Sequence, residues 1–248
     1  MKVLALNGSP RTSQGATDLI TRSFLQGAEE AGAEVETIYL ARKKIKYCTG
    51  CMNCWFVHPG DCIQDDDMAE ILEKLTAADM QVYASPVYTD GFTGQMKTML
   101  DRSIPVGTPF IVKKDGHARH PGSAKYKRKS PAKMVLISTC GFGERDNFDP
   151  IIMHTRALAR NLGYEYLGEL VRPMGPALQM LVGLEPERAA PILEAFRRGG
   201  YEAVADNVIR PEVQETAAQP IMSLEEFMGM VNQFAKAEID KNATARGA

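Results

Sequence analysis

The sequence predicts an α/β domain built on a doubly wound, five-stranded parallel sheet, with a helical extension at its C-terminal end. Two observations predict this fold. Short apolar segments that end in glycine or proline turns alternate with segments of helical periodicity up to residue 171, and no further strand pattern follows. The composition agrees, since 44% of the 248 residues are hydrophobic and 24% are charged, as in a globular protein with a substantial core.

The individual elements follow from local patterns along the chain. Apolar runs bounded by turn residues predict strands, and apolar positions three or four residues apart predict helices. The acidic run 65–67 suits a helix start, where backbone amides and the helix dipole favour carboxylates. The expected strands are 2–7, 35–40, 80–85, 134–139 and 164–171, and the expected helices are 16–31, one from the acidic run to 77, 95–103, 151–162, 186–207 and 224–238.

Strands that alternate with helices form right-handed βαβ units, and therefore a parallel sheet that is covered on both faces. Five strands in about 170 residues are typical of the flavodoxin-like fold, whose strand order is 2-1-3-4-5. We therefore expect a domain at 1–171 that contains a cysteine loop at 48–62 and a basic insertion at 104–131. A helical extension at 172–248 would pack on this domain or on a partner subunit, after a link at 172–176 that breaks regular structure.

Charge and hydropathy exclude several classes of protein. The net charge of −2 indicates neither a nucleic-acid partner nor a membrane partner. No apolar run approaches the roughly 18 residues that a membrane-spanning helix needs. The apolar run VLAL near the start ends at Asn7 and is shorter than the apolar region of a secretory signal, so a cytoplasmic location is expected.

The first predicted strand runs directly into a loop rich in hydroxyl side chains, and a helix follows. This arrangement directs free backbone amides and the positive end of a helix to one point, which is an anion site. Ser9, Ser13 and Thr17 add hydroxyl donors, and Arg11 can add positive charge. The spacing fits neither the dinucleotide fingerprint nor the P-loop, and it suits the free oxygens of a terminal monophosphate. The alternative is an ordinary strand–helix turn that Ser and Thr cap.

The segment 85–97 follows the third strand, where a ligand anchored beside the first strand would extend. Pro86 and two glycines allow the backbone to approach a flat ring closely. Tyr88 and Phe92 offer faces for stacking on an aromatic cofactor. The alternative is that Tyr88 only packs at the edge of the loop.

Together these segments resemble the NAD(P)H-dependent FMN reductase and iron–sulfur flavoprotein branch of the flavodoxin-like superfamily. The matching stretches are LNGSPR, then CTGCMNCW followed by DDDM, then SPVY followed by GQMKTMLDR. The resemblance extends over residues 1–170 and implies an FMN-dependent oxidoreductase or electron-transfer protein. NAD(P)H would be its co-substrate, a small molecule or a protein its electron acceptor, and a homodimer or homotetramer its assembly.

The resemblance also implies where FMN binds. The flavin itself would carry the chemistry, so no catalytic acid or base is expected. Its phosphate would lie in the first loop, and its ring would lie against the segment after the third strand and the turn after the fourth. The implied contacts are Ser9, Arg11, Ser13, Gly15, Ala16, Thr17, Pro86, Val87, Tyr88, Thr89, Asp90, Gly91, Thr139, Cys140, Gly141 and Phe142.

Four of the five cysteines lie close together, at Cys48, Cys51, Cys54 and Cys62. This spacing can supply four thiolates to one [4Fe–4S] cluster, and it resembles the pattern of the iron–sulfur flavoproteins. Zinc fits less well, because structural zinc sites usually use two separated CxxC pairs. Free or redox-active thiols remain an alternative, and with them a non-catalytic redox sensor or metal-binding interaction module. Cys140 stands apart and is expected to be a small buried hydrophobe.

The insertion 104–131 carries seven lysine and arginine residues and two histidines. Such a patch could attract the phosphates of a nicotinamide dinucleotide. The alternative is a solvated loop with no ligand. Just before the insertion, Asp101 and Arg102 are expected to make structural hydrogen bonds or an ion pair rather than to catalyse a reaction.

Overall fold

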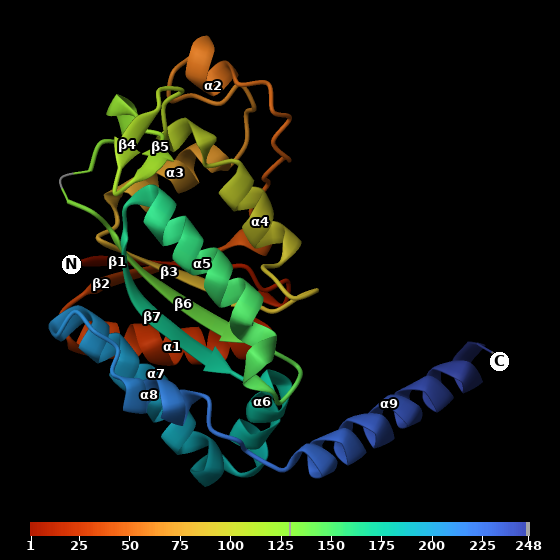
Figure 1. Ribbon diagram of the computed structural model, residues 1–248. Helices are drawn as coiled ribbons and strands as arrows, with labels where there is room; N and C mark the ends of the chain where they lie inside the picture. The colour runs from red at the N-terminus through yellow and green to blue at the C-terminus, as the bar shows by residue number, and fades with distance from the viewer. Residues whose placement is uncertain (129, 247–248) are drawn as a thin grey trace.

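The structure is a computed structural model that describes residues 1–128 and 130–246. Lys129 of the predicted insertion and the last two residues of the predicted extension lie outside the described residues. Five parallel strands in the order β2-β1-β3-β6-β7 form the central sheet, which confirms the predicted order (Figure 1). The strands are β1 (Lys2–Asn7), β2 (Glu34–Tyr39), β3 (Met80–Pro86), β6 (Lys133–Thr139) and β7 (Glu165–Arg172).

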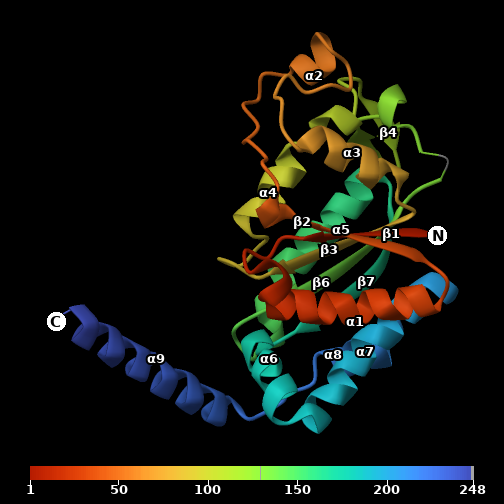
Figure 2. The same cartoon turned by 180° about the vertical axis from the view of Figure 1, so that it is seen from behind.

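Helices cover the sheet in two layers (Figures 1 and 2). Side chains alternate along β1, so Val3 and Ala5 face one layer while Leu4 and Leu6 face the other. The first layer consists of α1 (Ala16–Glu30), α6 (Gly175–Leu184), α7 (Pro186–Ala205) and α8 (Pro211–Ala217). The second layer consists of α3 (Met68–Ala77), α4 (Gly94–Asp101) and α5 (Asp149–Leu162).

Helix α7 lies directly against α1, because a glycine from each helix allows the two backbones to touch. A Cβ added at Gly27 would lie 1.7 Å from the Arg197 carbonyl oxygen, and one at Gly200 would lie 1.8 Å from the Phe24 carbonyl oxygen. The side chains of α6, α7 and α8 belong to the same core as those of β1 and β3. The chain after residue 171 therefore packs on the core and completes the covering of one face of the sheet.

The prediction that residues 172–176 break regular structure is wrong at its C-terminal end. Helix α6 begins at Gly175 and has a proline in its first turn. There the fixed φ and the missing N–H of proline suit a helix start, so the Gly-Pro pair begins a helix rather than preventing one. Helix α8 was not expected either. Helix α9 (Leu224–Arg246) is longer than predicted and extends away from the body (Figures 1 and 2).

The insertion 104–131 is not wholly irregular, because it contains an antiparallel hairpin of β4 (Val112–Lys114) and β5 (His117–Arg119). Asp115 and Gly116 form its turn with φ of 51° and 79°. An Asp-Gly pair is a preferred sequence for such a turn, so the signal was present in the sequence. Short 3-10 helices occur at Thr12–Gln14, Leu40–Arg42, Ile104–Val106, Ala124–Tyr126 and Arg145–Phe148.

Residues 44–67, here called the cysteine lobe, lie off the sheet beyond α3 and α4 and contain the short helix α2 (Asn53–Phe56) (Figure 1). The hairpin β4–β5 lies at the same end of the molecule (Figure 1). Within the part of the chain that the structure describes, no helix combines the length and the apolar character needed to cross a membrane.

Candidate functional site

Three loops, those that follow β1, β3 and β6, lie at the carboxyl edge of the sheet and are hydrogen-bonded to one another. Thr93 Oγ1 donates to the Gly8 carbonyl at 2.7 Å, which joins the β3 loop to the β1 loop. The Val87 amide donates to the Thr139 carbonyl at 2.8 Å, which joins the β3 loop to the β6 loop. Thr17 Oγ1 lies 2.9 Å from Thr139 Oγ1, which completes the set. Each loop is therefore fixed by the other two.

The loop after β1 is shaped by hydrogen bonds within itself and to the start of α1. The Ser9 amide donates to Asn7 Oδ1 at 2.9 Å, and Asn7 Nδ2 donates to Asp18 Oδ1 at 3.3 Å. A Cβ at Gly15 would lie 3.1 Å from Ser9 Oγ, so glycine leaves space above that hydroxyl. Helix α1 begins at Ala16, and the amides of a first helical turn have no acceptor within the helix. The cradle therefore fits a phosphate group.

Arg42 joins this loop although the sequence analysis did not select it. One guanidinium nitrogen donates to Ser13 Oγ at 2.9 Å and to Thr12 Oγ1 at 3.2 Å. Its guanidinium carbon lies 4.5 Å from the centre of the Tyr39 ring. Arg42 follows β2, the neighbour of β1, so the rule that parallel strands end at one edge was a signal that could have found it. Arg11 lies exposed on the same loop.

The segment expected to face a flat ring forms a tight turn. Tyr88 and Gly91 exchange backbone hydrogen bonds of 3.0 and 3.2 Å. The two residues between them, Thr89 and Asp90, have φ of 46° and 61°, which gives a two-residue turn of the mirror-image type. Left-handed backbone at residues other than glycine is strained, and such strain is concentrated at ligand sites.

The aromatic residues at this edge differ in how open they are. The Tyr88 side chain is 50% exposed, so its ring is available for stacking. Phe92, the second expected stacking residue, instead packs edge-on against His154, with ring centres 5.1 Å apart. Phe142 in the loop after β6 is 64% exposed. Tyr88 and Phe142 therefore present open aromatic surface at the edge of the sheet.

The loop after β6 is held by the last residue of β7 and by the start of α6. The Cys140 amide donates to the Arg172 carbonyl at 3.1 Å, and the Gly175 amide donates to the Cys140 carbonyl at 2.9 Å. A Cβ at Gly175 would lie 2.9 Å from Thr139 Cβ, so glycine lets the start of α6 approach the loop. Cys140 is buried as predicted, and burial raises the pKa of its thiol. Gly141 is exposed at the tip.

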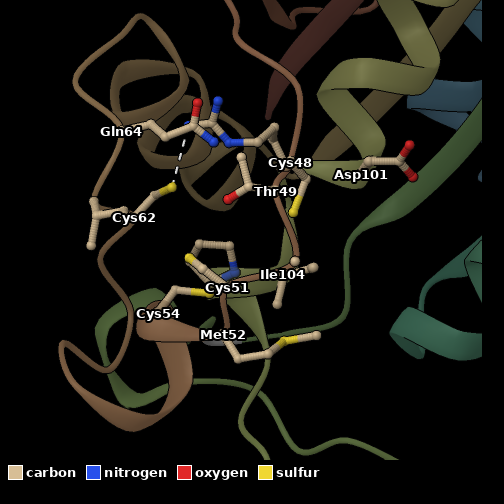
Figure 3. Close-up of a pocket in the computed structure, with 13 residues that line it drawn as sticks. Cys48, Thr49, Cys51, Met52, Cys54, Cys62, Gln64, Asp101 and Ile104 are labelled. Atoms are coloured by element: carbon tan, nitrogen blue, oxygen red, sulfur yellow. Dashed lines mark hydrogen bonds between the residues drawn. The ribbon is translucent and has the colours of Figure 1, made fainter.

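The four clustered cysteines line one pocket in the cysteine lobe, and Figure 3 shows their sulfur atoms arranged around it. Cys48 and Cys51 are exposed, Cys62 is half-buried and Cys54 is buried. Across the described residues, no three His, Cys, Asp or Glu side chains are placed to hold a single metal ion. The thiols therefore surround a space rather than meet at a point. This all-sulfur set fits a [4Fe–4S] cluster, in which each thiolate binds a different iron, better than it fits one zinc ion.

Local hydrogen bonds distinguish the thiols. Asn53 donates to Cys51 Sγ through its backbone amide and its side chain, and Thr49 donates through its hydroxyl, so the pKa of Cys51 is lowered. Burial raises the pKa of Cys54, and the negative charge of the other three thiols raises it further. The Cys51 thiol therefore loses its proton more readily than the Cys54 thiol.

Arg102 is buried beside this pocket and pairs with Asp66 through two parallel hydrogen bonds of 2.7 and 3.1 Å. The side chains of Arg102 and Asp66 are 1% and 3% exposed. Arg102 also donates to the Lys46 carbonyl at 2.7 Å and to Cys62 Sγ at 3.4 Å, the dashed line in Figure 3. Burial alone would lower the pKa of Arg102, but Asp66 and Cys62 outweigh it and raise that pKa, so the guanidinium stays charged.

Helix α4 connects the two candidate sites. Its N-cap Thr93 belongs to the bonded loops at the sheet edge, and Arg102 follows its last turn. Eight helical residues span about 12 Å. Asp101 and Arg102 were expected to make structural hydrogen bonds or an ion pair. Asp101 pairs with Lys97, and Arg102 pairs with Asp66.

Comparison with known proteins agrees with this geometry. Residues 1–123 match the family described as NADPH-dependent FMN reductase. This match covers residues 1–123, which contain the phosphate loop, the turn at Tyr88–Gly91, the cysteine lobe and α4. The loop after β6 and the helices α6–α9 lie beyond the match.

Similar curated proteins include an iron–sulfur flavoprotein of Archaeoglobus fulgidus, 41% identical over 43% of this chain and 47% of its own length. Another, an iron–sulfur flavoprotein of Methanocaldococcus jannaschii, is 41% identical over 46% of this chain and 57% of its own length. The chain thus spans about half the length of these curated relatives. Among solved structures, a flavone reductase gives a TM-score of 0.57 at 24% identity, covering 86% of this chain and 69% of its own, which supports the fold.

Proposed function

We propose that this protein is an FMN-dependent oxidoreductase that takes electrons from NAD(P)H and passes them to a small-molecule or protein acceptor through a [4Fe–4S] cluster in the cysteine lobe. The observation that carries this proposal is the pair of sites at the two ends of α4. A phosphate cradle with open aromatic surface lies at one end, and a pocket lined by four thiols lies at the other. The relatives named iron–sulfur flavoproteins support the same combination.

At the sheet edge the chain binds and orients the cofactor. The hydroxyls of Ser9 and Thr17 and the first amides of α1 would hold the FMN phosphate, and Arg42 would add positive charge beside them. Tyr88 would lie against the ring, and the turn that it begins would bring backbone close to the ring edge. When bound, FMN accepts hydride or single electrons, and the protein supplies position and surroundings.

In the cysteine lobe the four thiolates would hold the cluster, which supplies one-electron exchange when bound. Cys48 and Cys51 lie at the surface, so this centre is open to an external electron acceptor. All five cysteines are free thiols, which suits the reducing cytoplasm where we place the protein.

We also infer a homodimer or homotetramer. Helix α9 projects from the body and exposes Met228, Val231, Phe234 and Ile239 (Figure 1). Exposed apolar side chains in such number favour association. Light scattering on the full chain measures the assembly, and a monomer at all concentrations would contradict this inference.

The cofactor proposal is tested on protein purified without oxygen. We expect flavin absorption near ~450 nm with a broad shoulder that bleaches on reduction, together with iron and acid-labile sulfide. Cys54→Ala should remove the iron, whereas Cys140→Ala should retain it. A colourless protein that takes up neither FMN nor iron would contradict the proposal and favour an interaction module without a cofactor.

The phosphate loop is tested separately. Ser9→Ala and Thr17→Ala should each weaken FMN binding by about ten- to a hundredfold, since a hydrogen bond to a charged group contributes about 1.5–3 kcal/mol. Thr155→Ala is the matched control, because Thr155 is equally buried and donates to a carbonyl of its own helix. Flavin fluorescence measures the affinity for FMN. If Ser9→Ala and Thr17→Ala bind FMN as tightly as wild type and Thr155→Ala do, this loop is not the phosphate site.

A further inference from the structure

We propose that Arg102 is a positioning residue for the thiol pocket, which holds Cys62 in place and raises the reduction potential of the bound cluster by placing a fixed positive charge beside it. This inference rests on the proposed [4Fe–4S] centre. It concerns a residue beyond the four thiolate ligands, and it follows from the contacts of the Arg102 guanidinium.

The first step is the charge balance of the pocket. Among the described residues that line it, Arg102 is the one cation, and Asp101 is the one carboxylate. A cluster held by four thiolates is anionic, and reduction adds a further negative charge. Asp66 balances the charge of Arg102, but it is Arg102 and not Asp66 that lines the pocket and contacts Cys62, so the positive end of this pair faces the thiols. A positive group in that place stabilises the more negative state, because charges interact strongly where water is excluded. The net charge around an iron–sulfur cluster is one of the factors that set its potential.

The guanidinium of Arg102 has a fixed orientation. Two hydrogen bonds to Asp66 and one to the Lys46 carbonyl fix its plane, and one terminal nitrogen then reaches Cys62 Sγ at 3.4 Å. The remaining donor, Nε of Arg102, is buried and has no acceptor among the residues that the structure describes. A buried donor without an acceptor is costly, so the side chain is prepared for an acceptor that the described residues do not supply. A sulfide of a bound cluster is such an acceptor.

The bonds made at position 102 require arginine. Its planar fork serves Asp66, Lys46 and Cys62 at once and keeps a further donor. Lysine carries the same charge on one nitrogen and cannot make this set of bonds. Arg102→Lys should therefore keep the reduction potential of the cluster close to that of wild type but hold Cys62 less firmly. Arg102→Gln should lower the potential and also hold Cys62 less firmly.

The experiment uses the full chain, purified without oxygen and reconstituted with iron and sulfide. Iron and sulfide per chain, the rate of bleaching by a chelator, and a potentiometric titration followed by electron paramagnetic resonance are measured for wild type and both variants. At a fixed potential, Arg102→Gln should raise the ratio of oxidised to reduced cluster by about tenfold, which is about 59 mV for a one-electron couple. Its bleaching should be several times faster than that of wild type, while the potential of FMN in the same sample should not move.

Arg128→Gln is the matched control. Arg128 also donates to backbone carbonyls, those of Leu75, Thr76 and Ala78 at the end of α3, and Arg128→Gln should leave the cluster potential unchanged. If Arg102→Gln does not assemble a cluster but Arg102→Lys does, the need for positive charge is supported.

A wild-type potential in Arg102→Gln at full iron content overturns the inference. So does equal loss of iron in Arg102→Gln, Arg102→Lys and Arg128→Gln, since that indicates a general destabilisation. The two proposals fail in different ways: wild-type protein that takes up no iron contradicts the proposed function before any Arg102 variant is measured.

Discussion

The loops at the carboxyl edge of the sheet and the cysteine lobe are held in place by different kinds of contact. The edge loops continue from parallel strands. The loop after β1 leads into α1, and α1 is in turn held by its backbone contact with α7 at Gly27 and Gly200. The cysteine lobe contributes no strand to the sheet. Its residues are tied to the rest of the molecule mainly by side chains, through Arg102 to Asp66, Lys125 to Asp61 and Trp55 to the Ile104 carbonyl.

The difference indicates that the edge loops lose their geometry only when the sheet unfolds, whereas the cysteine lobe can open by itself. The chain offers a way to separate these events. Trp55 is its single tryptophan and lies in the lobe, where its indole N–H donates to the Ile104 carbonyl at 3.1 Å. Tryptophan fluorescence therefore reports the lobe, and far-ultraviolet circular dichroism reports the sheet and its helices.

The largest effect is expected for Asp66→Ala. Removing one partner of a buried ion pair costs about 3–5 kcal/mol, because the remaining charge stays buried without compensation. In urea the Trp55 transition should move to much lower denaturant, while the dichroism transition should move little. Glu70→Ala serves as the control, since Glu70 makes exposed ion pairs with Lys43 and Lys74, and it should move neither transition. Transitions that shift together in Asp66→Ala would show that the lobe does not open alone.

Gly200→Ala should give the opposite pattern. The added Cβ would lie 1.8 Å from a backbone oxygen of α1, so the two helices must separate, at a cost of about 3 kcal/mol. Both transitions should then shift together, because the lobe is attached to the sheet. Gly183→Ala, in α6 with open space around the added carbon, should be neutral or stabilising. If Gly200→Ala is equally neutral, the close contact of α1 and α7 is wrong.

As the pH falls, the cysteine lobe should open before the sheet unfolds. Burial alone would raise the pKa of Asp66, but the donors of Arg102, Lys46 and Met68 outweigh it and lower that pKa. A lowered folded-state pKa means that Asp66 stabilises fully above its unfolded value of about 3.9, and that this contribution is lost as the pH falls further. Trp55 fluorescence should therefore change below about pH 4 while dichroism persists, and Asp66→Asn should remove this step. Simultaneous loss of both signals would contradict it.

The smallest effect is expected for Arg42→Gln at the phosphate loop. The Arg42 side chain is exposed, so its charge contributes only about 0.2–1 kcal/mol, or at most about fivefold in FMN affinity. The effect should shrink in high salt because exposed charges are screened. Flavin fluorescence titrations at two salt concentrations measure it. A loss greater than that of Ser9→Ala would mean that charge, rather than the hydroxyl and amide donors, dominates phosphate binding.

Much of the fold could be predicted because its signals are local. The apolar runs of β1, β3 and β6 and the turns after them are continuous in sequence, and parallel order follows from their alternation with helices. The start of α6 was missed because Gly175-Pro176 has two meanings, a break or a first helical turn, and only its packing against Thr139 decides between them. The hairpin at 112–119 was missed although its Asp-Gly turn was visible.

In the candidate site, too, the features with a local sequence signal were predicted and the long-range pairings were not. The cysteines were found because their spacing is local, and the phosphate loop because it follows a strand directly. Arg102 and Asp66 meet across 36 positions of the chain, and periodicity says nothing about such pairings. The acidic run was interpreted only as a helix start. Asp66 does accept a hydrogen bond from the Met68 amide there, but its second role as the partner of Arg102 needed the tertiary structure.

The contact of α1 with α7 also bears on how the protein is made. Synthesis proceeds from the N-terminus, so the helix that follows the phosphate loop is finished long before the residues that will cover it, Arg197 and Gly200, leave the ribosome. The contacts that close the cysteine lobe are complete once Lys125 has emerged. During synthesis, therefore, the thiol pocket can close before α7 covers α1, so the proposed cluster site can form before the proposed phosphate site.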